Sequence, residues 1–396
     1  MSSDIVGYRL RFVDVWQNNA DYFKSLQLLA GLSRLFSEND VPYLDYRLVE
    51  NMFCRFYDAV NDARSCIAYD ARLGHLGIGI KTFILKNDAS VEKIAEFNKL
   101  RPELVGLKGF DLAVKLGEFR NSRMEFADNA YAVSLSKYHI VGRCNGFLRI
   151  FNTEYERVDI DNIHNVRTLQ SGGISFEDGR NEYRFNISKS VLLKHFYTPR
   201  CYKDIPIRII ENPLDYLMSL MPDVGMGGFL SQKLPIMLAV RSEYVILPLY
   251  SSRGRQKEIP VKSGLNQWNA GGRARDCNEV YIPIPIGIRR KYPDFFPDRD
   301  TLFILELPNG DHLQAKVCQD DGKALMSNPN SALGEWLLRK VLKKKAGELV
   351  TMSDLLRIGI DSVIVTKKPD KNKDGLAVYG ISFFDTPESY DDFVRK

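Results

Sequence analysis

The sequence predicts a two-domain protein of α+β or α/β class. At 396 residues, the chain exceeds what one ordinary hydrophobic core holds together. Within residues 1–100 apolar side chains recur first at helical and then at strand spacing, and from 130 to 187 the period shifts towards two. We expect an N-terminal domain at 1–200, a connecting segment at 201–260 and a C-terminal domain at 261–396.

The first hundred residues predict the order helix, helix, strand, strand, helix. Residues 24–39 and 44–61 carry apolar side chains at helical spacing. Residues 66–69 and 76–85 have the composition of strands. Ser90 suits the N-cap of a helix over 91–97.

The following hundred residues favour strands. Residues 140–151 predict one strand or a pair, and 174–185 predict a hairpin that turns at Asp178 and Gly179. Residues 188–196 predict a short helix, and 333–344, in the second domain, an amphipathic one.

Composition narrows the class of protein. A hydrophobic fraction of 44% with 27% charged residues is typical of a globular chain. The net charge of +5 permits nucleic-acid binding without requiring it. The six cysteines include no Cys-x-x-Cys pair, which argues against a disulfide framework or structural zinc. The charged N-terminus and the lack of a long apolar run predict a cytoplasmic protein without membrane contact.

The segment 263–330 has the composition of a DNA reader. Its first part alternates glycine with planar amide and guanidinium side chains. Arginine can grip a guanine edge with two hydrogen bonds, and asparagine or glutamine can do the same on adenine. Trp268 would anchor this part against a surface. The plainer alternative is a basic surface loop between two strands.

Five short segments in the last third of the sequence carry a family resemblance. They are Gly264-Leu-Asn-Gln-Trp-Asn-Ala270, Tyr281-Ile-Pro-Ile-Pro285, Ala315-Lys-Val-Cys-Gln319, Lys323-Ala-Leu-Met-Ser-Asn-Pro-Asn330 and Gly359-Ile-Asp-Ser-Val363. Together they resemble the C-terminal DNA-recognition domain of NgoFVII-family type II restriction endonucleases. That domain is similar to the β pseudobarrel of plant B-three transcription factors.

The resemblance implies two loop arms that clasp the major groove. We define the N-arm as residues 267–275 and the C-arm as residues 323–330. The DNA-binding residues that the resemblance implies are Gln267, Trp268, Asn269, Arg273, Arg275, Lys323, Ser327, Asn328 and Asn330. The usual nuclease half of that family is phospholipase-D-like and needs a His-x-Lys motif, yet no histidine of this chain is followed two residues later by lysine.

An acid and a lysine near two predicted strand ends suggest a different nuclease. Phosphodiester hydrolysis requires carboxylates that hold Mg²⁺ and a cation that positions the attacking water. Asp70 ends one predicted strand and Lys81 lies on the next, an arrangement that resembles the PD-(D/E)xK core, a mixed sheet flanked by helices. As a plain alternative, Asp70 is a turn residue and Lys81 a charge at a strand edge.

The resemblance to that core is incomplete. Gly79 stands where its second carboxylate belongs. Some members of that superfamily move the carboxylate to the helix after the lysine, which here implies Glu96, with Glu92 as the alternative. Glu50, on the helix before the first strand, would complete the site. Asp70 and Glu96 are the expected metal ligands.

Another basic position, Arg143, lies on a predicted strand close to the pair Tyr138-His139. This group could contact a phosphate, although a structural histidine is the simpler interpretation.

The leading hypothesis is a Mg²⁺-dependent type II restriction endonuclease that cuts double-stranded DNA at or near a short sequence. Cutting both strands implies a homodimer, and such an enzyme needs a cognate DNA methyltransferase as its functional partner. The rival hypothesis is a non-catalytic DNA-binding regulator whose N-terminal domain serves oligomerisation. A third is a nuclease that acts on modified DNA.

Overall fold

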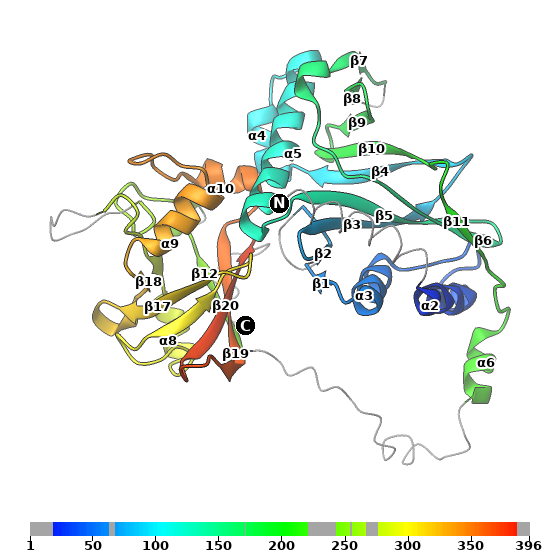
Figure 1. Ribbon diagram of the computed structural model, residues 1–396. Helices are drawn as coiled ribbons and strands as arrows, with labels where there is room; N and C mark the ends of the chain where they lie inside the picture. The colour runs from blue at the N-terminus through cyan, green and yellow to red at the C-terminus, as the bar shows by residue number, and fades with distance from the viewer. Residues whose placement is uncertain are drawn as a thin grey trace, which may run out of the picture. The chain divides into compact units, whose positions relative to one another are not determined.

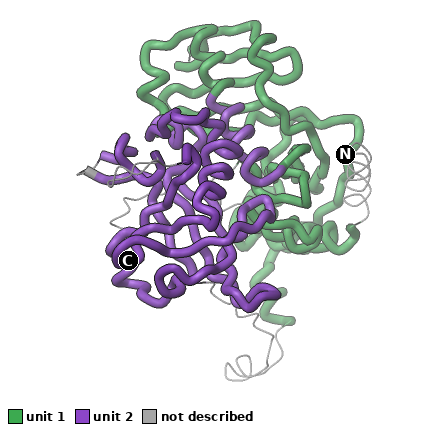
Figure 2. The backbone as a smooth tube through the Cα atoms, turned by 60° about the vertical axis from the view of Figure 1, so that its left-hand side comes forward, with its two compact units in different colours: residues 1–64, 68–118, 133–234 green, residues 65–67, 119–132, 235–396 purple. Residues whose placement is uncertain are grey.

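The computed structural model describes residues 19–62, 68–170, 172–220, 243–253, 256–266 and 276–385. They form two compact units, shown in different colours in Figure 2. Unit 1 holds the described residues up to 220 except 119–132, and unit 2 holds 119–132 and those from 243 onward. Helix α5 (Gly109–Tyr131) supplies its first part to unit 1 and its second to unit 2. Across the described ranges no helix is long and apolar enough to cross a membrane.

A six-stranded mixed sheet forms the centre of unit 1. Strands β3 and β5 run parallel, and all other neighbours are antiparallel. The strand order across the sheet is β1 (Val60–Asn61), β2 (Ala71–Leu73), β3 (Leu76–Ile84), β5 (Leu135–Cys144), β6 (Phe147–Glu154) and β11 (Lys203–Pro206).

Helices α2 (Ala20–Gly31) and α3 (Tyr46–Tyr57) cover one face of this sheet (Figure 1). The Asn19 side chain caps the first helix and Asp45 caps the second, each accepting backbone N–H groups. The apolar stripes of both helices pack with sheet residues such as Ile78 and Val141 in one buried core. These helices confirm the two that the sequence predicts, although the first ends at Gly31 rather than at residue 39 and is followed by a 3₁₀ turn at Ser33–Leu35.

A second, five-stranded antiparallel sheet lies over the other face of β3 and β5 (Figure 1). The Phe196 ring of this sheet packs against two rings of the first sheet, tilted against Phe83 and edge-to-face with Tyr138. Its strand order is β4 (Ala89–Glu96), β10 (Val191–Tyr197), β9 (Glu182–Asn186), β8 (Gly173–Glu177) and β7 (His164–Thr168).

Two sequence predictions are wrong in this sheet. Residues 91–97 and 188–196 were expected as helices, but they lie in β4 and β10, which pair with each other. Short segments with apolar residues at 91, 94 and 95 fit either period, and pairing between distant segments decides. The predicted hairpin at 174–185 is confirmed as β8 and β9, whose ladder closes at Glu177 and Glu182.

The strand expected at 66–69 is not observed as such. Residues 66 and 67 lie outside the described residues, and β2 begins only at Ala71. Several short elements complete unit 1. Helix α6 (Pro213–Leu220) follows β11, and helix α4 (Arg101–Leu104) follows β4. Further 3₁₀ turns lie at Asn98–Leu100 and Ile160–Asn162.

Unit 2 is built on a seven-stranded sheet that nearly closes into a barrel. Only β16 and β20 are parallel neighbours, and the edge strands β12 and β15 also come into contact. The order is β12 (Tyr244–Pro248), β19 (Ser362–Lys371), β20 (Ala377–Phe384), β16 (Phe303–Glu306), β17 (His312–Cys318), β18 (Ala324–Asn328) and β15 (Ile282–Pro283).

Short helices and a hairpin surround this sheet. They comprise β13 (Ser251–Arg253) with β14 (Gln256–Glu258), α8 (Ile286–Lys291), α9 (Ala332–Gly334) continued by a π-helical segment (Glu335–Val341), and α10 (Met352–Ile358). The helix expected at 333–344 therefore forms, but with mainly π-type geometry. The connecting segment 201–260 is divided, since 203–206 join the sheet of unit 1 and 244–248 that of unit 2.

Candidate active site and candidate nucleic-acid interface

Asp70 is held in place by the β2–β3 hairpin. Its backbone N–H donates to the carbonyl of Ile78 at 2.9 Å, and its carboxylate accepts a hydrogen bond from the N–H of Ile80 at 2.7 Å. Burial raises the pKa of Asp70, while the Lys81 ammonium and the Ile80 N–H act in the opposite direction. The hairpin therefore brings the predicted acid and lysine together.

Glu50 joins them from helix α3. Its side chain is buried, with only 7% exposed. Burial and then the nearby Asp70 charge raise the pKa of Glu50 from 4.5 to about 7, while Lys81 and Arg47 lower it. Two close carboxyl groups beside one lysine form what we call the acid–lysine cluster: Glu50, Asp70 and Lys81.

Gly79 cannot carry the carboxylate that the PD-(D/E)xK pattern expects there. A Cβ at this position would lie 2.6 Å from the Tyr155 ring and 2.9 Å from the Tyr138 ring. These two rings are stacked with centroids 4.1 Å apart, so neither moves easily. The departure from the pattern thus has a steric cause.

The two alternative carboxylates lie on strand β4 rather than on a helix, which corrects the sequence prediction. Burial raises the pKa of Glu92, while the Ser90 hydroxyl and then the Lys81 and Arg143 charges act in the opposite direction, so Glu92 lies within electrostatic range of Lys81. Glu96 is exposed and contacts Lys93 and Asn98. Four residues of strand separate Glu96 from Glu92 by about 13 Å. The structure therefore places Glu92, not Glu96, near the cluster.

Among the described residues, no three His, Cys, Asp or Glu side chains are grouped closely enough to hold a metal ion together. Glu50 and Asp70 still provide two adjacent carboxylates. Magnesium commonly binds one or two carboxylates and completes its shell with water and substrate phosphate. The pair therefore fits this ion, with a shell completed from outside the protein.

A cleft of about 770 Å³ opens beside Glu92; we call it the β3–β4 cleft. Strands β3, β4, β5 and β10 all contribute to its lining. Its polar lining residues are Thr82, Lys86, Ser90, Glu92, Arg143, His195 and Tyr197.

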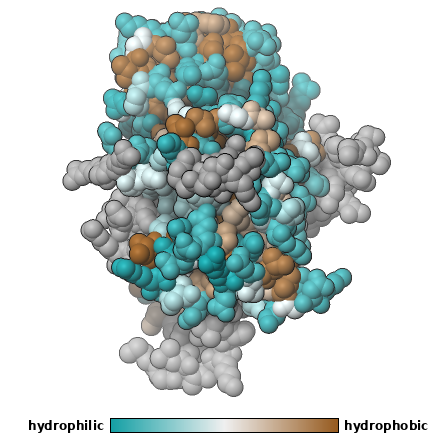
Figure 3. Space-filling model, turned by 90° about the vertical axis from the view of Figure 1, so that its left-hand side faces the viewer, coloured by the Kyte–Doolittle hydropathy of each residue, from teal (hydrophilic) through white to brown (hydrophobic). Residues whose placement is uncertain are grey.

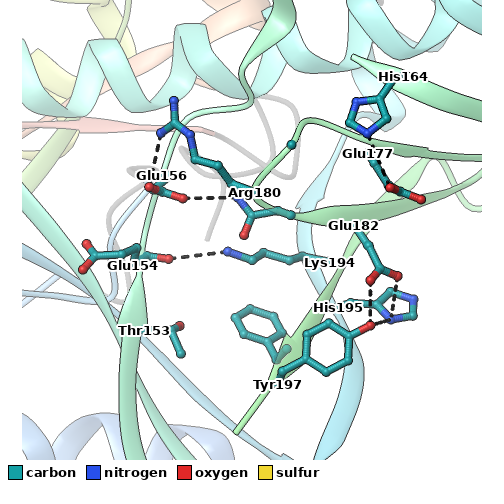
Figure 4. Close-up of a pocket in the computed structure, with 13 residues that line it drawn as sticks. Thr153, Glu154, Glu156, His164, Glu177, Arg180, Glu182, Lys194, His195 and Tyr197 are labelled. Atoms are coloured by element: carbon teal, nitrogen blue, oxygen red, sulfur yellow. Dashed lines mark hydrogen bonds and ion pairs between the residues drawn. The ribbon is translucent and has the colours of Figure 1, made fainter. Parts of the chain in front are cut away.

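A second cleft of about 460 Å³ lies over β8, β9 and β10 (Figure 4). Arg180 lies 3.2 Å from Glu156, and the imidazoles of His164 and His195 lie 3.5 and 3.6 Å from Glu177 and Glu182. Burial lowers the pKa of His195. Lys194 points across the cleft to the backbone carbonyl of Glu154. The arginine of this cleft is thus already paired with a carboxylate.

His139 is a structural residue, as the simpler interpretation held. It is fully buried, and its ring nitrogens contact the Tyr22 hydroxyl at 2.9 Å and the Asn152 amide oxygen at 3.0 Å. Burial lowers the pKa of His139 to about 4.

The C-arm of unit 2 is mostly strand rather than loop, because β18 covers residues 324–328. Lys323, Asn328 and Asn330 are exposed. Ser327 is 1% exposed, and its hydroxyl donates to the Pro329 carbonyl and accepts from the Leu333 N–H, both at 2.8 Å. It therefore shapes the end of the arm and is not placed to touch a base.

The N-arm residues Gln267, Trp268, Asn269, Arg273 and Arg275 lie outside the described residues. Its entry is fixed by Asn266, whose amide bonds the carbonyls of Pro260 and Val350 and the N–H of Val350. Asn266 is therefore a structural amide, although its type also suits base reading.

The exit of the N-arm is fixed by Arg339. Its guanidinium donates to the Asn278 side chain at 2.7 Å and to the Cys277 carbonyl at 2.6 Å. Sequence reasoning missed this role, since a basic residue in a helical segment is typical of a solvated helix end.

The surface of one face of the molecule is predominantly hydrophilic, with apolar residues in small separate patches (Figure 3).

Comparison with known proteins bears on unit 2. Residues 244–369 match the family model of the NgoFVII C-terminal B3-like DNA-binding domain. This range includes strands β12, β15, β16, β17 and β18 of the barrel-like sheet and most of β19, and it ends before β20. No curated protein sequence matches the chain. The chain thus carries a restriction-enzyme-like C-terminal DNA-binding domain, for which double-stranded DNA is the partner.

Proposed function

We propose that this chain is a Mg²⁺-dependent type II restriction endonuclease that hydrolyses double-stranded DNA at or near a short recognised sequence. The observation that carries the proposal is the acid–lysine cluster of unit 1 in the same chain as a restriction-enzyme-like DNA-binding domain. A helix, a hairpin and a parallel strand position the cluster, the arrangement that the PD-(D/E)xK resemblance implies.

Asp70 and Glu50 would hold the metal ion in this proposal, in place of the expected pair Asp70 and Glu96. A bound magnesium ion supplies Lewis acidity at the phosphate. Burial and then the Asp70 charge raise the pKa of Glu50, and a cation between the two carboxylates would relieve their repulsion. Glu92 stays beside Lys81 and orients it.

Lys81 would position the attacking water. Hydrolysis forms one P–O bond to the water oxygen and breaks one P–O bond to the leaving strand. An ammonium group at the reacting phosphate offsets the charge that builds up in the transition state. Lys81 is half-buried, with Glu50 and Asp70 as its neighbours in the cluster and Glu92 as a third acidic neighbour. Its charge is therefore less screened by water than that of an exposed lysine.

Recognition would fall to the two arms of unit 2. Exposed Lys323, Asn328 and Asn330 of the C-arm, and Gln267, Trp268, Asn269, Arg273 and Arg275 of the N-arm, carry the side chains that read bases and phosphates. Cutting both strands would require a homodimer. A cognate DNA methyltransferase would protect the host sequence.

The test is plasmid cleavage by the full chain with Mg²⁺ or with EDTA. The proposal predicts discrete fragments with Mg²⁺ and intact plasmid with EDTA. If the plasmid stays intact both with Mg²⁺ and with EDTA while a gel shift shows sequence-specific binding, the rival hypothesis of a DNA-binding regulator is favoured. The closed position at Gly79 favours that rival. Parallel digests of methylated and unmethylated plasmid test whether modified DNA is the substrate.

A further inference from the structure

The β3–β4 cleft contains two hydrogen-bond donors that the fold leaves unused. The Nε of Arg143 and the hydroxyl of Thr82 are both buried and have no hydrogen-bond partner among the residues that the structure describes. Buried donors without partners are rare in native proteins and cost about 1–3 kcal/mol each. Both residues line the same cleft.

We propose that this cleft binds a backbone phosphate of the DNA duplex next to the phosphate that is cut, with Arg143 and Thr82 as its donors. The inference rests on the proposed function, because it takes DNA as the ligand. It assigns a substrate-positioning role to Arg143, whereas the acid–lysine cluster performs the chemistry.

The geometry of Arg143 supports an anion as the ligand. Its guanidinium lies 5.7 Å from the centre of the Tyr43 ring, which holds the side chain in one orientation. Strand pairing sets Arg143 opposite Ile84, two residues beyond Thr82 on β3. A planar guanidinium and a nearby hydroxyl are donors that suit adjacent oxygens of a phosphate.

The charge of the cleft agrees with this ligand. Arg143 and Lys86 face a single carboxylate, Glu92, whose oxygen already accepts from the Ser90 hydroxyl at 2.6 Å. The second cleft differs, since its arginine, Arg180, is paired with Glu156 and Asp159. Because Glu92 also lies beside Lys81, the β3–β4 cleft adjoins the acid–lysine cluster. A duplex cut there would place a neighbouring phosphate within reach.

The experiment measures DNA binding in EDTA, where no cleavage occurs, as a function of salt. For Arg143→Gln we expect the slope of log K against log salt to fall by about 1, the value for one lost phosphate contact. Arg180→Gln is the matched control, since Arg180 is neutralised by Glu156 and Asp159, and its slope should equal that of the wild type.

Thr82→Val provides a second, nearly isosteric variant that removes an unsatisfied hydroxyl, so it should fold as well as the wild type. We expect it to weaken DNA binding several-fold. Methylphosphonate scanning of a duplex selected for binding should then show one neutralised phosphate that weakens the wild type but not Arg143→Gln.

Unchanged slope and unchanged affinity in both folded variants would overturn the phosphate assignment. If Mg²⁺-dependent cleavage persists in that case, only this inference fails. If no DNA is ever cut while Arg143→Gln still lowers the slope, the phosphate site stands and the nuclease proposal fails.

Discussion

Three buried polar side chains of unit 2, Asp361, Asn266 and Ser327, complete hydrogen bonds within the protein, whereas in unit 1 the buried carboxyl of Glu50 lies close enough to Asp70 to feel its charge. Asp361 is fully buried and accepts from Lys257 at 2.6 Å, and Asn266 and Ser327 are also satisfied. Glu50 instead has a pKa raised to about 7. Hydrogen-bonded buried groups rigidify a fold, whereas a perturbed carboxyl pKa beside a second acid is the pattern that the proposed metal site requires.

The proposed function accounts for this contrast. In that proposal the N-arm must hold its position on DNA, and the flanking residues Asn266 and Arg339 make their hydrogen bonds within the protein. The acid–lysine cluster is proposed to bind a metal ion and a phosphate, which would supply the charges that the cluster lacks. Substitutions in the two units should therefore differ in kind, and the predictions below test that difference.

Glu50→Gln should produce the largest combined effect. We expect cleavage to fall at least about 100-fold, since even outer partners of metal ligands are typically worth 10–100-fold. In EDTA the same variant should be more stable at pH 8. Because the folded pKa is raised to about 7, the wild type loses stability as pH rises from 4.5 through 7. Thermal melts at pH 5 and pH 8 measure the stability of the wild type and of the variant. Equal pH dependence of the two melting temperatures would contradict the buried environment assigned to Glu50.

Ser327→Ala should destabilise unit 2. The variant leaves the buried N–H of Leu333 without its acceptor, which costs about 1–3 kcal/mol. Denaturant unfolding checks this value, and DNA affinity should fall as the arm loosens. Unchanged stability would show that the hydroxyl does not support the arm.

Asn328→Ala should impair sequence discrimination but not stability, the reverse of what we expect for Ser327→Ala. The side chain is exposed, so stability should change by less than about 0.5 kcal/mol. Discrimination between the recognised sequence and a single-base variant should drop by about 1–3 kcal/mol, the worth of one bidentate base contact. Competition gel shifts measure it. Preserved discrimination would remove Asn328 from the set of base readers.

Glu96→Gln should have the smallest effect. Its carboxylate is exposed and bound to Lys93 and Asn98 at the far end of β4. Cleavage should stay within about twofold of the wild type, in contrast with Glu50→Gln. A loss as large as that of Glu50→Gln would restore Glu96 as the metal ligand.

The sequence predicted the elements whose signals are local. The helices capped by Asn19 and Asp45, strand β3 and the hairpin at Asp178 were all expected. Asp70 and Lys81 were expected together because a single hairpin connects them. The pairing of β4 with β10 was missed, because partners about a hundred residues apart leave no local signal. Because residues 91–97 were expected as a helix, Glu96 rather than Glu92 was preferred as the carboxylate near Lys81.

The roles of Asn266, Ser327 and Arg339 were also beyond sequence reasoning. Each has a type that suits DNA contact, and only the position of its partners shows that it serves the fold. Burial, rather than residue type, separates the two roles. The same distinction identified Arg143, whose Nε is buried without a partner among the described residues.

The central claim is that Lys81 and its two carboxylates cut the DNA that unit 2 binds. The most direct measurement compares Lys81→Ala with the wild type in one preparation, by gel shift on the recognised duplex and by plasmid cleavage with Mg²⁺. The account predicts nearly unchanged sequence-specific binding and a cleavage rate lower by about 10²–10⁴-fold, the range for losing a positioned catalytic group. Cleavage by Lys81→Ala at the wild-type rate would contradict it.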